Sequence, residues 1–373
     1  MRTFIGVNDA QTVKKWADSA ATGINKTSYF AKSMMGSGED SRLPIQKLTD
    51  LQTGSGDEVT YDLLMPLNME PIIGDETLDG KEAALKFYTD RMRIDQVRAG
   101  VDLGSRMTQK RTLRDLRKAA RRNMIDYWAR LYDELFFIYL SGSRGTQTGY
   151  IWPALSPYFQ VNTLTAPDTM HLMYGGAATS KATVAATDTM KLRMIDRAVA
   201  RAETMGGDGT DELSMVPCDV DGEKRYALLM HTFQFDALKS DGTTGQWIDI
   251  QKAAAASQGQ QNPIFKGSEG MYAGVVLRKH RNVVGFSDYG AGANLPARRA
   301  LFLASQAAVI AFGDRGDGMQ FDWTEELKDH GNSMKIGTHA QIGVKKTTYK
   351  SKDGLVTRDF GVIAIDTYAI DPA

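Results

Sequence analysis

Histidine and cysteine side chains are the ones that most often bind metals or act as nucleophiles. The chain contains one cysteine, Cys218, and five histidines, which are His171, His231, His280, His330 and His339. No two of these histidines stand at H-x-H or H-E-x-x-H spacing, and one cysteine cannot supply the paired thiolates of a zinc site. We therefore predict no metal site, and we interpret Cys218 as a small buried side chain.

The sequence also lacks the loops that usually bind phosphate or expose a nucleophile. It has no G-x-x-x-x-G-K-S/T loop, no G-x-S-x-G turn and no G-x-G-x-x-G loop after an expected strand. The acidic loop 314–318 has Gly316 where a calcium loop needs Asp or Asn. Glu325 and Glu326 are adjacent, so their side chains diverge and form a poor catalytic pair. We predict no catalytic residue and no cofactor, and a soluble enzyme is the least favoured class.

Composition restricts the remaining classes of function. A chain of 373 residues is longer than one hydrophobic core usually serves, so two or more lobes are expected. Its 45 basic and 45 acidic residues cancel, which disfavours bulk attraction to DNA and permits dense self-association. The sequence contains neither an apolar leader nor a run of about 18 apolar residues. We therefore expect no membrane span and synthesis in a cytoplasm.

Residues 1–53 are interpreted as an arm that lies outside the main core. A short amphipathic helix in this segment would carry Val13 and Trp16 on one face. A polar stretch then leads to the aromatic pair Tyr29 and Phe30. Such a segment has little to bury against locally. We therefore expect Trp16, Tyr29 and Phe30 to pack against another subunit.

Residues 54–103 are interpreted as a long two-stranded ribbon. Apolar and polar residues alternate from Val59 to Leu67, and a return strand is expected from about Leu85 to Val97. The tip between them lies at 73–80. An isolated hairpin is marginal in water, and its bare edges invite pairing. We therefore expect the ribbon to contact a neighbouring subunit through its tip and return strand, with Asp75, Leu78, Phe87 and Tyr88 as candidates.

Residues 107–140 are predicted to form one long helix inside a spine region, 104–145. Apolar residues recur there at spacings of three and four, which places them on one face. They are Leu113, Leu116, Ala120, Met124, Tyr127, Leu131, Leu135 and Ile138. At 1.5 Å per residue this helix would be about 51 Å long, more than the width of a small domain.

The first half of the expected helix is basic over residues 106–122. One interpretation is a nucleic-acid-binding patch. The other is an intersubunit face that pairs with acidic residues of a neighbour, and for this role Arg114, Arg117 and Arg121 are the candidates. We favour the second interpretation, because the whole chain is neutral and no aromatic residues interleave with the cations to stack bases.

Residues 146–320 are interpreted as a separate lobe of helices and strands, followed by β-structure over 321–373. Within the lobe, the apolar run Ala300–Phe312 fits either a helix or a strand. Near the C-terminus, Ile336–Thr348 and Val356–Ala369 are predicted to pair as one hairpin around a turn at Ser351–Gly354. The fold class expected from these elements is α+β.

The order of these parts resembles the capsid fold of tailed phages known as the Hong Kong 97 fold. The residues themselves resemble the major capsid protein family of N-four-like podophages and related tailed phages. The resembling stretches run from the arm to the last expected strand, and they include Val13–Trp16, Tyr29–Lys32, Gly74–Glu82, Phe87–Asp90, Ile94–Arg98, Gly104–Arg111, Asp126–Ala129, Gly245–Lys252, Asn262–Phe265, Trp323–Glu326 and Phe360–Tyr368. Each block alone is a weak signal, but their shared order is a strong one.

This resemblance implies an N-terminal arm at 1–53, an extended β-hairpin loop at 54–103 and the spine helix of a peripheral domain at 104–145. It further implies an axial domain at 146–320 and the C-terminal strands of the peripheral domain at 321–373. The implied function is a major capsid protein that forms hexamers and pentamers of an icosahedral shell around double-stranded DNA. Portal, scaffold and cement proteins are possible partners. The implied location is the virion capsid, assembled in the cytoplasm of a bacterial host.

Two other functions are kept for comparison. An encapsulin-like nanocompartment shares the fold but encloses enzymes instead of a genome. A nucleic-acid-binding protein would use the basic segment 106–122, and its DNA affinity would fall steeply with salt.

Overall fold

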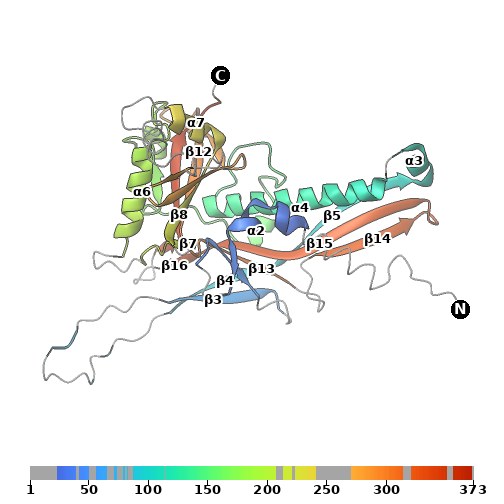
Figure 1. Ribbon diagram of the computed structural model, residues 1–373, viewed down its shortest axis with the longest axis horizontal. Helices are drawn as coiled ribbons and strands as arrows, with labels where there is room; N and C mark the ends of the chain where they lie inside the picture. The colour runs from blue at the N-terminus through green and yellow to red at the C-terminus, as the bar shows by residue number, and fades with distance from the viewer. Residues whose placement is uncertain are drawn as a thin grey trace, which may run out of the picture.

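A long helix runs through the molecule and connects its two ends in the computed structural model (Figure 1). The structure describes residues 23–38, 42–49, 56–64, 71–73, 79, 82, 87–113, 115–206, 213–220, 223–240, 270–313, 321–350 and 356–371. The helix is α4 (Leu116–Ser141), which starts in a narrow extension and ends against a lobe of helices and strands. Mixed helices and sheets make the fold α+β, as expected from the sequence.

The helix predicted over 107–140 is broken near its start. The structure has α3 (Arg106–Arg111), an extended residue at Thr112 and then α4. The break occurs because the Asp115 carboxylate caps α4, accepting hydrogen bonds from the backbone N–H groups of Arg117 and Lys118 at 3.1 and 3.2 Å. At the other end, Gly142 adopts a left-handed conformation with φ 66°, which ends the helix.

Burial along α4 changes from one face to all faces. In its first half only Ala120, Met124 and Trp128 and their neighbours face the core, whereas every residue from Leu131 to Ser141 is buried. The first half therefore lies on a single sheet, and the second half is enclosed by the core. The other helices in the part of the chain that the structure describes are α2 (Tyr29–Ser33), α5 (Tyr158–Val161), the 3₁₀ turn η2 (Lys181–Thr183), α6 (Leu192–Thr204) and α7 (Thr232–Ser240).

A six-stranded sheet forms the extension and the base of the molecule. Its strands run in the order β1-β2-β13-β15-β14, and β5 pairs with β15 as well. They are β1 (Met35–Ser37), β2 (Ile45–Leu48), β5 (Asp95–Ser105), β13 (Ala308–Phe312), β14 (Asp322–Lys328) and β15 (Ser333–Lys346). Helix α4 packs above β5 and β15, where Leu103, Trp323 and Ile336 contact Ala120 and Met124.

An eight-stranded sheet forms the lobe. Its order is β6-β18-β12-β8-β10-β9, with β11 paired to β12 and β7 paired to β8. Its strands are β6 (Leu172–Tyr174), β7 (Cys218–Val220), β8 (Glu223–Met230), β9 (Met271–Tyr272), β10 (Val275–Lys279), β11 (Gly285–Tyr289), β12 (Leu295–Leu303) and β18 (Val362–Tyr368). Buried residues of α6 and α7, such as Ile195 and Leu238, share one hydrophobic cluster with this sheet.

Among the described residues, the two-stranded ribbon is shorter than the sequence predicts. Strands β3 (Glu58–Leu64) and β4 (Phe87–Arg93) pair antiparallel over seven residues each, with Glu58 opposite Arg93. The return strand does not continue as part of the ribbon beyond Arg93. After Ile94 the chain enters β5, which pairs with β15 in the six-stranded sheet. The expected tip at 73–80 lies almost wholly outside the described residues.

The structure decides one open expectation about strands and corrects another. The apolar run Ala300–Phe312 belongs to two strands, β12 and β13, which turn at Gln306 (φ 53°) and enter different sheets. The predicted C-terminal hairpin is limited to the three-residue strands β16 (Thr348–Lys350) and β17 (Thr357–Asp359). Strand β18 pairs with β12 and β6 in the lobe instead, because its apolar residues on both faces suit a central strand.

Candidate assembly surfaces

The candidate contact residues fall into an N-terminal region, the ribbon and the basic end of the long helix. Trp16, Asp75, Leu78 and Arg114 lie outside the described residues, and the Phe87 side chain does as well. The structure places Tyr29 and Phe30 on α2, Tyr88 on β4, and Arg117 and Arg121 on the first half of α4.

Helix α2 is held against α4 by one buried carboxylate. Asp133 of α4 accepts hydrogen bonds from the Ser28 hydroxyl at 2.7 Å, from the Tyr29 backbone N–H at 3.0 Å and from the Phe30 N–H at 3.3 Å. The Tyr29 and Phe30 N–H groups lie in the first turn of α2, where a helix leaves its backbone N–H groups without an internal partner. Burial raises the pKa of Asp133, and these donors oppose that rise. A charged residue inside an apolar helix face was the sequence signal for this contact, but it was missed.

An aromatic cluster completes the attachment of α2. The Phe30 ring lies 5.1 and 5.0 Å from the rings of Phe136 and Phe137 and has no exposed surface. The expectation that Phe30 contacts another subunit is therefore corrected, since its own chain buries it completely. Tyr29 is half-buried, with its ring 4.8 Å from His280, so part of it is accessible to a partner.

The base of the ribbon is fixed to the body of the molecule through Asp90. Its carboxylate accepts hydrogen bonds from the Tyr61 hydroxyl at 2.8 Å and the Thr348 hydroxyl at 3.3 Å, and it pairs with the Lys345 ammonium at 2.5 Å. Tyr88, a candidate contact residue, packs its ring 5.9 Å from that of Tyr349 and is partly exposed. The base of the ribbon is therefore rigidly attached.

A polar groove of about 520 Å³ opens beside this base. It is bounded by β4, by β16 and by the segment 161–165. Most of its charges are already paired within the chain, because Glu58 binds Arg93 at 2.8 Å and Arg91 at 3.3 Å. The charged side chains that line the groove are therefore mostly engaged in contacts within the chain.

The basic half of α4 is partly neutralised within the chain. Arg117 forms a two-point ion pair with Glu325 of β14, at 2.9 and 2.8 Å, and the Trp323 indole N–H donates to the same carboxylate at 3.0 Å. Arg117, expected at an intersubunit face, thus already holds α4 to the sheet beneath it. Arg121 is half-buried beside it, whereas Lys118 and Arg122 are exposed.

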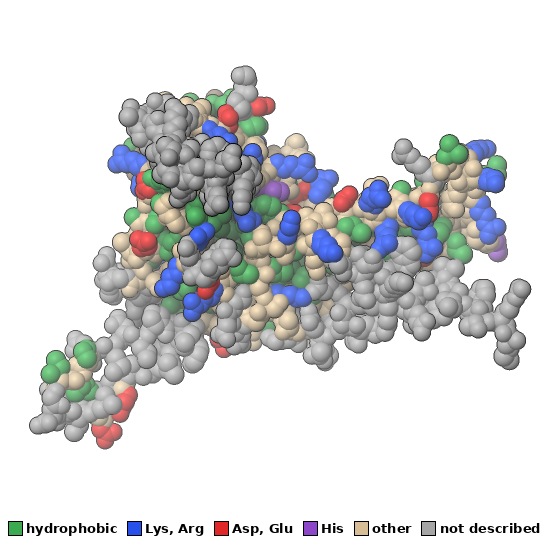
Figure 2. Space-filling model, in the orientation of Figure 1, with side chains coloured by type: hydrophobic (Ala, Val, Ile, Leu, Met, Phe, Trp, Pro, Cys, Tyr) green, Lys and Arg blue, Asp and Glu red, His purple; other side chains and the backbone are tan. Residues whose placement is uncertain are grey.

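The far end of the extension is formed by α3 and by the turn between β14 and β15. Arg106 donates from its backbone N–H to the Asn332 carbonyl and from Nε to the Gly331 carbonyl, both at 2.9 Å. Exposed apolar side chains nevertheless gather at this end, and they are Met107, Leu113 and Leu327. Figure 2 shows lysine and arginine side chains around them and along α4.

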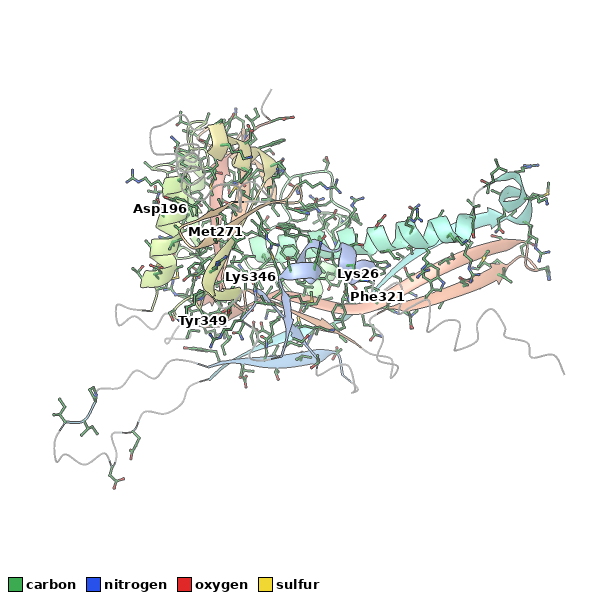
Figure 3. The ribbon with its side chains drawn as sticks, viewed as in Figure 1. Lys26, Asp196, Met271, Phe321, Lys346 and Tyr349 are labelled. Carbon is green, nitrogen blue, oxygen red and sulfur yellow. The ribbon has the colours of Figure 1, made fainter. Side chains whose placement is uncertain are left out.

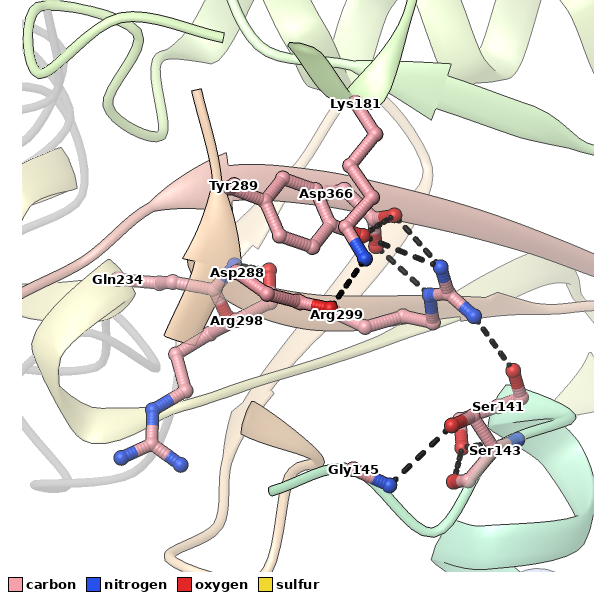
Figure 4. A network of polar contacts seen from close by, with 10 residues as sticks. All are labelled: Ser141, Ser143, Gly145, Lys181, Gln234, Asp288, Tyr289, Arg298, Arg299 and Asp366. Carbon is pink, nitrogen blue, oxygen red and sulfur yellow. Dashed lines mark hydrogen bonds and ion pairs between the residues drawn. The ribbon is translucent and has the colours of Figure 1, made fainter. Parts of the chain in front are cut away.

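Two buried charged networks lie where the two sheets meet. In the first, Arg299 of β12 pairs with Asp366 of β18 through two contacts of 2.7 Å and donates to the Ser141 carbonyl at the end of α4 (Figure 4). The Tyr289 hydroxyl donates to the same carboxylate at 2.5 Å. Asp366 has no exposed surface. The network therefore joins α4 to three strands of the lobe.

The second network surrounds Lys346, at the end of β15 near the middle of the molecule (Figure 3). Its ammonium lies 2.7 and 2.8 Å from the two carboxyl oxygens of Asp359, and both side chains are about 2% exposed. Burial lowers the pKa of Lys346 and raises that of Asp359, and the direct contact between the two groups opposes both shifts. Nearby, Asp168 accepts from His171 and from the Asp359 N–H.

Within the ranges that the structure describes, no three His, Cys, Asp or Glu side chains are grouped as metal ligands. Burial raises the pKa of the Cys218 thiol to about 12, which keeps it protonated and unreactive. Burial also lowers the pKa of His231 and of His280 to about 4. No described helix is long and apolar enough to cross a membrane.

An elongated subunit with a lobe, a helix-backed extension and a projecting ribbon has the Hong Kong 97 architecture of a capsid shell. The solved capsid of Ralstonia phage GP4 matches over 100% of both chains, with 46% identity and a TM-score of 0.83. The capsid of cyanophage Pam1 matches over 93% of both chains, with 19% identity and a TM-score of 0.70. The second likeness shows the shared fold alone.

The sequence comparisons identify the family. The chain belongs to the phage capsid protein family, whose model matches residues 4–371. The major capsid protein of Pseudomonas phage KPP25 is 27% identical over 351 residues, which are 88% of each chain. The chain is therefore a major capsid protein of a tailed phage, a subunit of the capsid shell of the virion. This confirms the function predicted from the sequence.

Proposed function

We propose that copies of this chain assemble through hexamers and pentamers into a closed icosahedral shell that encloses a double-stranded DNA genome. The observation that carries the proposal is the likeness to a phage capsid along the whole chain, at 46% identity and a TM-score of 0.83. The relatives named above are phage proteins, which favours a genome over an enzyme as the cargo.

The parts of the chain would then have separate roles in the shell. The ribbon would lie over a neighbouring subunit, and the N-terminal arm (1–53) would pack beneath. The lobe (146–320) would act as the axial domain and meet its copies around the local symmetry axes. The spine (104–145) and the C-terminal strands (321–373) would form the peripheral domain, although β18 pairs in the lobe sheet.

The energy of assembly would come from many modest contacts, because burial of apolar surface contributes roughly 25 cal/mol per Å². The ribbon supports this view. Its base is fixed by Asp90 and Glu58, whereas most of the described residues toward its end are exposed, with Ile73 at 81%. A bare apolar side chain on a two-stranded projection favours a partner surface.

The subunit would carry out no catalysis of its own, and it would assemble in the cytoplasm of a bacterial host. Portal, scaffold and cement proteins are candidate partners. The outward cations of α4, such as Arg122, would serve subunit pairing first and proximity to DNA second. Support for this order comes from Arg117, whose charge is already matched by Glu325.

Electron microscopy of the protein expressed alone, with size-exclusion chromatography, tests the proposal. We expect closed shells, or rings and tubes of capsomer size. If only monomers form, lysate from phage-infected cells should rescue assembly by supplying a scaffold. A monomer that never assembles, and whose DNA binding falls steeply with salt, would instead support the nucleic-acid-binding function.

A shortened ribbon separates folding from assembly. Deletion of residues 72–84 should leave a folded monomer, because the base contacts of Asp90 and Glu58 lie outside the deleted segment. The same protein should fail to form shells. Closed shells from the deletion variant would show that the end of the ribbon is not needed for assembly.

A further inference from the structure

One lysine of the chain is enclosed almost completely by protein. The Lys346 ammonium contacts both carboxyl oxygens of Asp359, at 2.7 and 2.8 Å, and each of the two side chains is 2% exposed. The preceding lysine, Lys345, pairs with Asp90, but those two side chains are 19% and 20% exposed. A lysine is rarely buried so completely, because its charged form then loses its hydration. The Lys346–Asp359 pair is therefore a pair of potentially reactive groups from which water is excluded.

The backbone holds these two side chains next to each other. Thr347 follows Lys346 and donates its N–H to the Ala307 carbonyl at 3.1 Å. Its own carbonyl accepts the N–H of Phe360, the residue after Asp359, at 3.0 Å. The two chain segments are thus joined directly beside the pair. Because the partners are already in contact and held in place, little freedom has to be lost for them to react.

A second carboxylate fixes the backbone of Asp359. Asp168 accepts the Asp359 N–H at 2.9 Å, and both of its oxygens lie 3.0 Å from Nδ1 of His171. The His171 side chain is 3% exposed and that of Asp168 is 10% exposed. Asp168 is therefore a positioning residue, which holds Asp359 through its main chain.

Burial favours the uncharged forms of both partners. It lowers the pKa of Lys346 and raises that of Asp359, whereas their mutual attraction opposes both shifts. The uncharged forms, an amine and a carboxylic acid, arise when one proton moves between atoms that are already in contact. An uncharged amine is a nucleophile, and the carbon of a carboxylic acid accepts a nucleophile more readily than that of a carboxylate. The surroundings therefore bring the reactive form of each partner within reach.

We propose that Lys346 and Asp359 join in an isopeptide bond within one subunit, a modification that does not depend on the proposed shell function. The carboxyl group first rotates about its Cβ–Cγ bond, so that its face meets Nζ. A bond then forms between Nζ and Cγ, an N–H proton moves to the hydroxyl oxygen, and the bond from Cγ to that oxygen breaks with release of water. Overall, one ammonium and one carboxylate become one amide and one water, and no other reactant is needed.

The bond would link the two sheets of the subunit. Lys346 ends β15 of the six-stranded sheet, and Asp359 lies shortly before β18 of the eight-stranded sheet. An amide between them closes the segment 346–359 into a loop, and a crosslink of this kind restricts the unfolded chain. An ion pair can separate when the local structure opens, whereas an amide stays intact. The crosslink would therefore make this connection permanent.

Mass spectrometry of the denatured full-length protein tests the proposal, on purified subunits and on any shells that they form. We expect an intact mass that is lower than the sequence mass by one molecule of water. Tryptic digestion should yield one branched peptide, in which Lys346 is uncleaved and joined to the peptide that contains Asp359. Tandem mass spectrometry of this peptide identifies the two joined residues.

Two variants with the same chemical change locate the bond. Lys346→Arg keeps the positive charge, but a guanidinium stays protonated and is a poor nucleophile, so this variant should have its full sequence mass. The matched control is Lys345→Arg, which alters the partly exposed pair with Asp90 and should still lose one water. Circular dichroism verifies that both variants fold.

Each outcome supports or overturns the bond. A water loss in the wild type and in Lys345→Arg, but not in Lys346→Arg, supports it, and the branched peptide of the wild type does so even if Lys346→Arg fails to fold. A wild-type protein with its full sequence mass would overturn the proposal and leave the two residues as an ion pair. A water loss that persists in Lys346→Arg would also overturn it, because the dehydration would then lie elsewhere, as in a cyclic imide at another aspartate. None of these results depends on assembly, so a failure of the shell function would be seen separately.

Discussion

The junction between the two sheets and the far end of the extension use charged residues in opposite ways. At the junction, Asp366 and Lys346 are buried, and each contacts a countercharge at 2.7 Å. At the far end, Lys110 and Arg111 are exposed on a short helix beside bare apolar side chains. Burial makes a charge depend on its partner in the same chain, whereas exposure leaves it available to another molecule. Mutations should therefore affect folding in the first region and assembly in the second.

The largest effect is expected at Asp366. Asp366→Asn would leave the Arg299 guanidinium buried without its countercharge, so the free energy of unfolding of the unassembled subunit should fall by about 3–5 kcal/mol. Urea denaturation monitored by tryptophan fluorescence would measure it. Asp288→Asn is the matched control, because its ion pair with Lys181 is half-exposed and should contribute less than about 1 kcal/mol. Equal decreases in the free energy of unfolding of the two variants would contradict the distinction between buried and exposed ion pairs.

The next effect is a loss of folding stability at acidic pH. Burial lowers the pKa of His231 and His280 to about 4, below the value of about 6.5 in an unfolded chain. Between these values the unfolded state binds more protons, so stability is complete above pH 6.5 and falls as the pH drops toward 4. Full protonation would cost roughly 3 kcal/mol per histidine in a dry site, and partial exposure to solvent should reduce the loss to about 2 kcal/mol. His280→Gln should make the pH dependence of thermal unfolding shallower, and an unchanged slope would exclude His280 as a contributor.

A smaller effect is expected where α2 meets α4. Asp133→Ala removes the acceptor of the Ser28 hydroxyl and of the Tyr29 and Phe30 N–H groups, which should cost about 2 kcal/mol. Hydrogen exchange should accelerate in α2 before it does in the lobe. Asp126→Ala, at an exposed position on the same helix, should change neither quantity. Global destabilisation without local exchange in α2 would show that Asp133 serves the core instead.

The smallest effect on folding should come from the far end of the extension. Leu113→Ser should alter the free energy of unfolding by no more than about 0.5 kcal/mol, because the side chain is fully exposed. The yield of shells should nevertheless decrease. Leu155→Ser provides the comparison, since Leu155 is 95% exposed in a loop of the lobe. Equal shell yields from the two variants would remove Leu113 from the contact surface.

The sequence allowed the architecture to be predicted wherever local patterns and tertiary packing agree. The order of parts resembled a phage capsid, and the family and structural matches confirm that function and fold. The helix over 107–140 was mostly right, because the apolar residues of its second half are buried together with the residues between them. Its break at Thr112 was missed, because Asp115, which lies inside the predicted helix, is itself the cap that starts α4.

Sheet membership could not be predicted from local patterns. Nothing in the run Ala300–Phe312 distinguishes a strand of the lobe from a strand of the extension, yet β12 and β13 enter different sheets. Val362–Tyr368 has the apolar character of a central strand, but its partner, β12, is about sixty residues earlier and is set by tertiary packing. The candidate contact residues remain predictions, apart from Phe30, which its own chain buries.

The chain passes between the two sheets by three covalent routes: through α4 between β5 and β6, at the turn between β12 and β13, and through β16 and β17 between β15 and β18. A force that pulls the lobe away from the extension must therefore act along stretched backbone as well as across packed side chains. The load is shared by these three backbone connections. The buried ion pairs of Arg299 and Lys346 strengthen the packing beside them. The subunit should therefore resist mechanical separation of its two sheets. Under load, a shell made of it would break first at the contacts between subunits.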